Sequence, residues 1–317
     1  MKNFDTPWGA LPWLAAVLLT TLVAGCGGGR DPILGTGTGT GAGSTGVIGL
    51  TAPPATAPSF GSGALLARFG IFGGSAGMTN TGNQTVITGS GGNTADIGTI
   101  ATSNSSITGF HDSAPSDVYT ESPGVNVGNV TGKIYTCTNS TTGPTSAGVN
   151  AASCTTATNA LAEALAAYNA LVAQPAGPNP GAGNLANLTL APGVYTAAGG
   201  SFKIEGGNLT LDAQGNANAV WVFQMATTLT VGGPGAAAPQ SIILANGALA
   251  RNVYWQVGSA ATINAGGGGT MVGTILSQAG VSFSTAGNAA ATTLNGRALS
   301  LGASVTMVNT VITVPAQ

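Results

Sequence analysis

A short motif in which small polar residues alternate with apolar ones recurs through the C-terminal half of the chain. Its copies are residues 187–190, 208–211, 228–231, 262–265, 282–285 and, more loosely, 306–309. The copies start 21, 20, 34, 20 and 24 residues apart. In a β-strand this alternation places the apolar residues on one side and the polar residues on the other. Recurrence at about 20 residues or more indicates one solenoid coil per repeat, so stacked coils would form a polar array on one flat face.

Two further kinds of strand accompany the polar motif. Residues 220–224 and 253–256 match at an offset of 32, and residues 271–277 match 294–300 at an offset of 23. Three kinds of strand predict a mainly β fold, a triangular solenoid whose coils have three faces and are stabilised by stacking. The aromatic strands carry the largest apolar areas, so we expect them to face the core or a helix.

One segment, residues 155–174, breaks the β pattern because it is rich in Ala and Leu and lacks Gly and Pro. We predict a helix here, with Ser153 or Thr155 as its N-cap and Pro175 ending it. Its apolar residues recur at helical spacing and predict one buried face, which we expect to pack against the solenoid. The residues of this face are Leu161, Leu165, Tyr168 and Val172.

Charged residues make up only 5% of the 317 residues, against about a quarter in an average protein. With a net charge of −2 there is no basic footprint for nucleic acid. The carboxylates are isolated, so no paired acid/base site is predicted and we expect no enzyme, cofactor or small-molecule substrate. His111 is the single histidine, which argues against a metal site.

Residues 1–25 predict an export signal with an apolar stretch at 14–23. The sequence from Leu22 to Cys26 resembles a bacterial lipobox, in which the cysteine is lipidated after cleavage. An ordinary signal peptide cleaved near Gly25 remains the alternative. With Gly27 rather than Asp after the cysteine, the same resemblance implies an outer-membrane or cell-surface lipoprotein; otherwise the protein is secreted. The Gly/Thr/Pro/Ser-rich residues 26–63 predict a flexible linker.

Cys137 and Cys154 lie 17 residues apart, and in an exported chain we expect them to form a disulfide. They bracket the end of a polar segment, 103–152, which we interpret as an irregular capping insertion. Within it, residues 106–109 and 129–132 give weak strand signals. Before it, residues 69–72 and 84–88 predict strands.

Several stretches occur together in one order, and this set resembles the ice-binding-like domain of microbial antifreeze proteins. They are residues 79–82, 190–195, 209–215, 219–224, 252–258 and 294–299. The resemblance implies a discontinuous right-handed β-solenoid over residues 64–315 with one long helix beside it. It also implies binding to ice through a flat face and no catalytic residues. In some members a Thr-Ala/Gly-x-Thr/Asn pattern marks that face, and Thr285-Ala286-Gly287-Asn288 fits it.

A surface that matches ice must be flat, rigid and free of long charged side chains. Threonine supplies a methyl group and a hydroxyl on a stiff χ1, and holding it still costs little entropy. Stacked strands repeat every 4.7–4.9 Å or so, close to repeats of the ice lattice. We expect a monomer that contacts a membrane only through Cys26. The candidate ice-binding residues are Asn208, Thr210, Thr228, Thr230, Thr262, Asn264, Ser282, Ser284, Thr285, Asn288 and Thr306.

Two alternatives stay open at this point. The polar array is one of three faces, and another face could bind ice, because Thr and Asn are common on any exposed solenoid surface. The chain could also be a surface adhesin or structural lipoprotein that uses the same solenoid to bind another surface, such as a polysaccharide.

Overall fold

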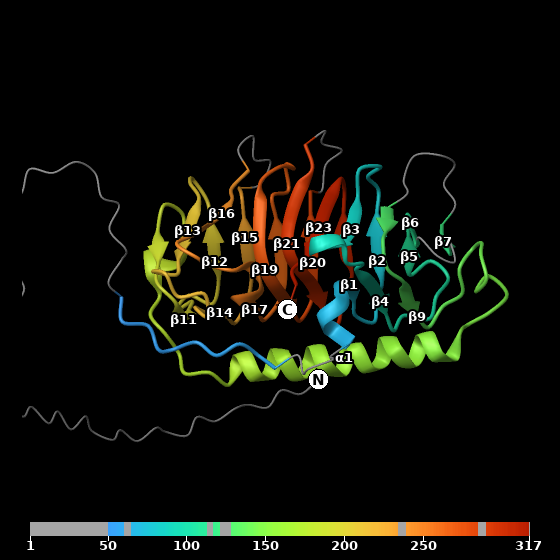
Figure 1. Cartoon of the computed structure of the whole chain (residues 1–317), viewed down its shortest axis with the longest axis horizontal. Coiled ribbons are helices and arrows are strands. Elements are labelled where there is room, and N and C mark those ends of the chain that lie inside the picture. The colour runs from blue at the N-terminus through green and yellow to red at the C-terminus, as the bar shows by residue number, and fades with distance from the viewer. Residues whose placement is uncertain are drawn as a thin grey trace, which may run out of the picture. The chain divides into compact units, whose positions relative to one another are not determined.

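The computed structural model describes residues 50–59, 65–112, 117–120, 128–233, 239–284 and 290–316. The predicted signal segment and most of the predicted linker therefore lie outside the described residues. Within them, the chain forms a mainly β solenoid with three faces and one long helix along its side (Figure 1). No helix in these described ranges is both long and apolar enough to cross a membrane.

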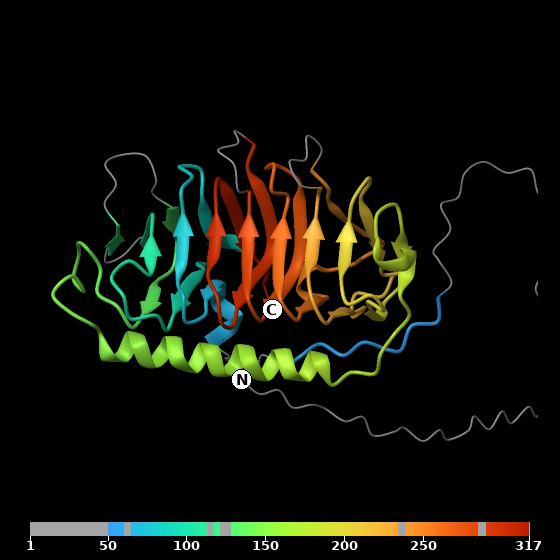
Figure 2. The same cartoon turned by 180° about the vertical axis from the view of Figure 1, so that it is seen from behind.

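One face, here called the seven-stranded face, is a sheet of short parallel strands that lie side by side toward the viewer in Figure 2. Its strands, in spatial order, are β12 (Phe202–Ile204), β15 (Leu229–Val231), β18 (Ala260–Ile263), β20 (Gly280–Phe283), β22 (Val305–Met307), β2 (Met78–Asn80) and β5 (Ile107–Thr108).

The helix-covered face consists of strands whose outer side lies against the long helix. They are β11 (Gly193–Thr196), β14 (Trp221–Met225), β17 (Val253–Val257), the second halves of β19 (Thr270–Ser277) and β21 (Thr292–Ser300), then β1 (Phe69–Gly73), β4 (Asp96–Thr99) and β9 (Ile134–Thr136).

The third face continues from the first halves of β19 and β21. Its other strands are β10 (Thr189–Leu190), β13 (Leu209–Asp212), β16 (Ile242–Ala245), β23 (Thr310–Val314), β3 (Val86–Gly89), β8 (Gly128–Val130) and β6 (Phe110–Asp112), with β7 (Val118–Tyr119) antiparallel at the edge. Gly273 and Gly296 pair where the two long strands pass from one face to the next. A Cβ on Gly296 would lie 1.9 Å from the Gly273 carbonyl oxygen, so this close passage requires glycine.

The chain does not wind the solenoid from one end to the other. Strands β1 to β9 start in the middle and build one end, and helix α1 (Ala151–Val172) then carries the chain back along the side (Figure 1). The coils from β10 onward return to the middle, where β21, β22 and β23 pair with β1, β2 and β3. In the part of the chain that the structure describes, four 3₁₀ turns complete the elements: η1 (Leu65–Arg68), η2 (Ser90–Gly92), η3 (Pro180–Gly183) and η4 (Ala250–Asn252).

The strand offsets predicted from the sequence match the register of the sheet. Val222 pairs with Tyr254, an offset of 32, and Met271 pairs with Leu294, an offset of 23. The aromatic strands face the core and the helix, as predicted. The rings of Phe223 and Trp255 stack with centroids 4.1 Å apart, and this packing makes the coil interior rigid.

Helix α1 is present as predicted, but its first residue, its N-cap and part of its buried face differ from the prediction. It begins at Ala151 rather than residue 155, and its cap is Asn150, whose Oδ1 accepts a hydrogen bond from the Ser153 N–H at 3.0 Å. Of the predicted buried face, Tyr168 is buried and Leu161 half-buried, but Leu165 and Val172 are 45% and 51% exposed. The buried residues are Ala157, Ala160, Ala164, Ala167, Tyr168 and Leu171. Alanines let the helix backbone approach the sheet closely, and larger side chains would hold it away.

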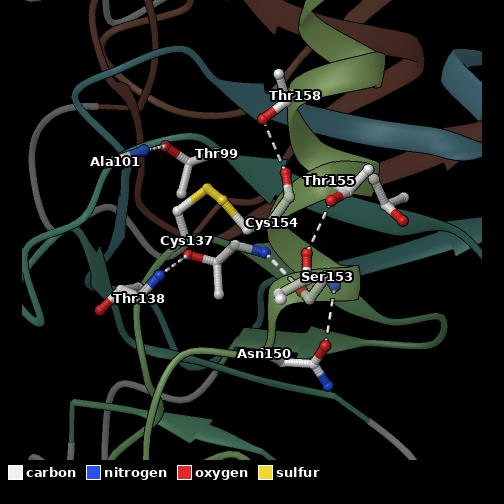
Figure 3. The surroundings of a disulfide bond; sticks show 12 residues. Thr99, Ala101, Cys137, Thr138, Asn150, Ser153, Cys154, Thr155 and Thr158 are labelled. Atoms are coloured by element: carbon white, nitrogen blue, oxygen red, sulfur yellow. Dashed lines mark hydrogen bonds between the residues drawn. A yellow bond between two sulfur atoms is a disulfide. The ribbon is translucent and has the colours of Figure 1, made fainter.

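The predicted disulfide between Cys137 and Cys154 is present and ties the end of β9 to the first turn of α1 (Figure 3). The Thr136 N–H also donates to the Ser153 Oγ at 2.9 Å. The described residues of segment 103–152 are more regular than expected. They contribute strands β5 to β9, which extend all three faces. Strands this short, separated by turn residues, carry little periodicity in the sequence.

Candidate functional site

On the seven-stranded face, six side chains with hydroxyl groups align in one row, here called the ladder. The strand register places Thr230 beside Thr262, Thr262 beside Ser282, Ser282 beside Thr306, Thr306 beside Thr79, and Thr79 beside Thr108. At the usual spacing of neighbouring strands the ladder is roughly 24 Å long. Every rung sits at the middle or end of a short parallel strand, so the row follows the regular sheet seen in Figure 2.

The ladder is rigid because the apolar side chains of its strands pack into the core. The residues on either side of each rung point inward and are buried, as in Leu229 and Val231 around Thr230, or Val281 and Phe283 around Ser282. The rungs themselves are half-buried between their neighbours. The Thr306 hydroxyl donates to the Ser282 hydroxyl at 3.0 Å. Packing from below and contact between rungs leave little side-chain freedom to lose on binding a rigid surface.

The two ends of the ladder differ in chemistry. Beyond Thr230 the next position is Lys203, whose ammonium pairs with Glu205 at 2.8 Å. An exposed lysine on this edge strand discourages pairing with another sheet edge. At the other end the Thr108 Oγ1 is buried, so this rung offers no exposed hydroxyl. Between these ends the rungs are uncharged.

Four of the predicted site residues, Thr230, Thr262, Ser282 and Thr306, are brought together in this row. Thr228 lies on the same face, one position before β15, and its hydroxyl lies 2.9 Å from the Ser201 Oγ. Thr285 and Asn288 lie outside the described residues, as does Cys26.

Asn208 and Thr210 belong to a different surface, which corrects the expectation of a single polar array. Thr210 pairs with Thr189 and Ile243 on the third face, and the Asn208 Oδ1 accepts from the Ser241 N–H at 2.8 Å. The polar motif is thus used on two faces. The coils differ in length, so equal sequence spacing does not keep a motif on one face.

Asn264 and Ser284 are also not on the surface, contrary to the prediction. Both are fully buried with positive φ angles of 44°, which places them at a solenoid corner rather than in a strand. The Asn264 side chain accepts from the Gln240 N–H at 3.0 Å and donates to the Gln240 carbonyl at 2.9 Å. Its role is to hold the neighbouring coil in place.

Sequence reasoning missed Thr79, Thr108 and the terminal Lys203 as members of the row. Each is a partly or fully exposed polar residue next to a buried apolar one, but the strand is only two or three residues long. The first two also lie in the N-terminal part of the chain. Only the discontinuous path brings them beside the C-terminal coils.

Two other notable polar residues, Asp212 and Arg297, make structural contacts. The Asp212 carboxylate accepts from the Gln214 N–H at 2.8 Å and so caps a turn. Arg297 donates to the Ala67 carbonyl at 2.7 Å, and burial lowers its pKa to about 10. Among the described residues, no three His, Cys, Asp or Glu side chains gather into a possible metal site.

Comparison with known proteins agrees with this architecture. A family model described as ice-binding-like matches residues 72–313. Ice-binding protein 1 of Shewanella frigidimarina (strain NCIMB 400) is 42% identical over 96 residues, which are 28% of this chain and 10% of that protein. An ice-binding protein of Nostoc sp. (strain HG1) is 40% identical over 124 residues, 39% of this chain and 41% of that protein. The matched stretches therefore span less than half the length of these relatives.

A solved structure extends the likeness to nearly the whole fold. The crystal structure of an ice binding protein from an Antarctic biological consortium aligns with a TM-score of 0.60 at 29% identity, covering 84% of this chain and 96% of that chain. The β-solenoid with its flanking helix is thus shared with solved ice-binding proteins. Since the family model covers well over half of the sequence, this chain belongs to the ice-binding-like family.

Proposed function

We propose that this protein binds ice crystals through the ladder and thereby slows ice growth or recrystallisation, or attaches the cell to ice. The observation that carries the proposal is the run of hydroxyl-bearing rungs from Thr230 to Thr79, in register and without charge. The similar proteins named as ice-binding support the ligand, and the geometry supports the face.

The ladder suits a crystalline ligand better than a small molecule. Each rung offers a methyl group or a hydroxyl at a regular spacing, so a lattice can meet several rungs at once. Every contact is weak, but simultaneous engagement of the row multiplies the affinity. Apart from one small hollow bordered by Thr79 and Thr306, the row is open, whereas small-molecule sites are concave.

A pair of matched substitutions tests which face is used. Thr262→Tyr places a ring in the middle of the ladder, and Thr210→Tyr places the same ring in the middle of β13 on the third face. Both parent residues are half-buried strand threonines. A ring on the ladder lifts several rungs off the lattice. We therefore expect Thr262→Tyr to require about tenfold more protein for recrystallisation inhibition.

Thr210→Tyr should leave that inhibition unchanged, with circular dichroism confirming that both variants fold. The reverse result, loss with Thr210→Tyr and none with Thr262→Tyr, would move the ice-binding site to the third face. No inhibition or thermal hysteresis from the folded parent protein would refute ice binding itself.

We further propose that the protein is exported and held at the outer membrane or cell surface by a lipid on Cys26. The apolar stretch and lipobox-like residues before this cysteine support the proposal, and the Gly/Thr-rich linker would let the solenoid reach away from the membrane. Mass spectrometry of the protein from membrane fractions tests it. A lipid-modified N-terminal cysteine is expected, and an unmodified soluble protein would leave secretion as the account.

A further inference from the structure

A second surface lies on the corner where the third face turns into the helix-covered face. Here the loop between β3 and β4, the loop between β8 and β9, and the start of β1 come together. They enclose a hollow, here called the corner hollow, lined by Arg68, Thr94, Asp96, Thr131, Gly132, Lys133 and Tyr135. Nothing in the ice-binding proposal uses these residues.

The corner hollow concentrates positive charge in a chain that has only seven basic residues. The side chain of Arg68 is 56% exposed, and Lys133 is an exposed residue. Their one acidic neighbour in the hollow is Asp96, which is 5% exposed. Among the residues that line this hollow, two accessible cations outnumber one buried carboxylate, while Asp112 and Asp117 line the neighbouring hollow that Lys133 also borders.

The buried carboxylate holds the Arg68 side chain and the backbone of Lys133. Asp96 Oδ2 lies 3.1 Å from the Arg68 guanidinium, and Asp96 Oδ1 accepts from the Lys133 backbone N–H at 2.9 Å. Gly132 permits this approach, since a Cβ there would lie 2.3 Å from the same oxygen. Asp96 is therefore a positioning residue that holds the Arg68 guanidinium and the backbone at Lys133.

The hollow also has features that suit a sugar. The Arg68 guanidinium lies 3.4 Å from the Tyr135 hydroxyl, and the Tyr135 ring packs against Phe69 on one side. A half-buried aromatic ring beside a fork of donors offers an apolar surface for a sugar ring and hydrogen bonds for its oxygens.

A second hollow adjoins the first, which points to a ligand with more than one unit. It is lined by Arg68 and Thr94 again, together with Asn93, Pro315 and neighbouring residues. Arg68 thus stands between two hollows, so a chain of sugars could occupy both while one guanidinium contacts it at the centre.

We propose that the corner hollow binds an anionic polysaccharide whose units carry carboxylates, with Arg68 and Lys133 contacting the acid groups and Tyr135 contacting a sugar ring. The site lies opposite the ladder, because each coil passes from the helix-covered face to the seven-stranded face and then to the third face. Strand β1 and η1 are on the near side in Figure 1, whereas the seven-stranded face is toward the viewer in Figure 2. A protein adsorbed to ice by its ladder would present this corner to an acidic matrix.

Binding of the full mature chain to alginate, a polymer of uronic acids, tests the proposal, with neutral dextran as the control polymer. Lys133→Gln removes an exposed cation and should weaken alginate binding about two- to fivefold. Arg68→Gln together with Lys133→Gln should weaken it by about tenfold or more. Lys203→Gln removes an exposed cation elsewhere and should have no effect.

Recrystallisation inhibition by Lys133→Gln should equal that of the parent, so failure of this site and failure of ice binding are distinguishable. Added salt should weaken alginate binding, as expected for exposed charges. Equal binding of dextran, absence of alginate binding, or an equal loss with Lys203→Gln would each overturn the proposal.

Discussion

Asn264 and Thr262 belong to the same sequence motif, but substituting them should have different effects, because Asn264 lies at a corner and Thr262 on the surface. Thr262 and Asn264 are two residues apart, yet the first is a ladder rung and the second is fully buried at a solenoid corner with a φ of 44°. If the structural assignment is right, Asn264 contributes to stability and Thr262 contributes to ice binding.

The expected cost of Asn264→Ala follows from its contacts. The side chain makes two hydrogen bonds to the backbone of Gln240, at 3.0 and 2.9 Å. Each buried bond is worth about 0.5–1.5 kcal/mol net. Alanine in the left-handed region adds about 1 kcal/mol that asparagine largely avoids. The free energy of unfolding should therefore fall by about 2–4 kcal/mol. Asn264→Gly keeps the backbone conformation and should lose about 1 kcal/mol less.

Equilibrium urea unfolding measures these differences, with the fluorescence of the buried Trp221 and Trp255 as the signal. Thr262→Val is the matched surface control and should change stability by no more than about 0.5 kcal/mol. The reasoning is refuted if Asn264→Ala is as stable as the parent but has lost recrystallisation inhibition, because Asn264 would then act at the ice surface.

Two further predictions concern the other end of the solenoid. Replacing Cys137 and Cys154 by serine should lower the free energy of unfolding by about 3 kcal/mol, since the bond closes a loop across 17 residues of separation; urea unfolding of the double variant checks this, and an unchanged midpoint would contradict it. Burial raises the pKa of Asp96 above its ordinary 3.8, despite the opposing Lys133 N–H and Arg68. The protonated form is thus favoured in the folded state, so this group's contribution to stability falls as pH rises from 3.8 through the folded-state pKa. Asp96→Asn should remove this part of the pH dependence, which parallel unfolding titrations of the parent and the variant would show; identical profiles would contradict it.

Local pattern was sufficient to predict the class of fold and much of its register. Alternation of polar and apolar residues identified β15, β18, β20 and β22, and sequence offsets gave the partners of the aromatic strands. These features depend on residues within one strand, or on strands that lie on the same face in neighbouring coils. The physical reason is that each strand must bury one side, whatever the rest of the chain does.

What could not be predicted depends on contacts between distant parts of the chain. No local pattern shows that residues near 79 lie beside residues near 306, because that pairing arises from the return path of α1. Strand alternation also continues into corners, where Ser284 and Asn264 turn inward because their φ angles are positive. On the helix, leucine spacing was misleading since close packing on a sheet favours alanine.

Continuity of the ladder across its middle depends on how the two halves of the solenoid join. Thr306 belongs to the C-terminal coils and Thr79 to the first coil, so the row is flat there only if the two coils are held in register. The buried Arg297 donates to the carbonyl of Ala67, which precedes β1. It also reaches the carbonyl of Pro315, which follows β23, at 3.5 Å. With a pKa of about 10 it remains charged at neutral pH. A buried cation therefore bonds to the chain just before β1 and just after β23, and so joins the coils that come first and last in the sequence. The proposed ice-binding row crosses the same junction on the opposite side of the coil.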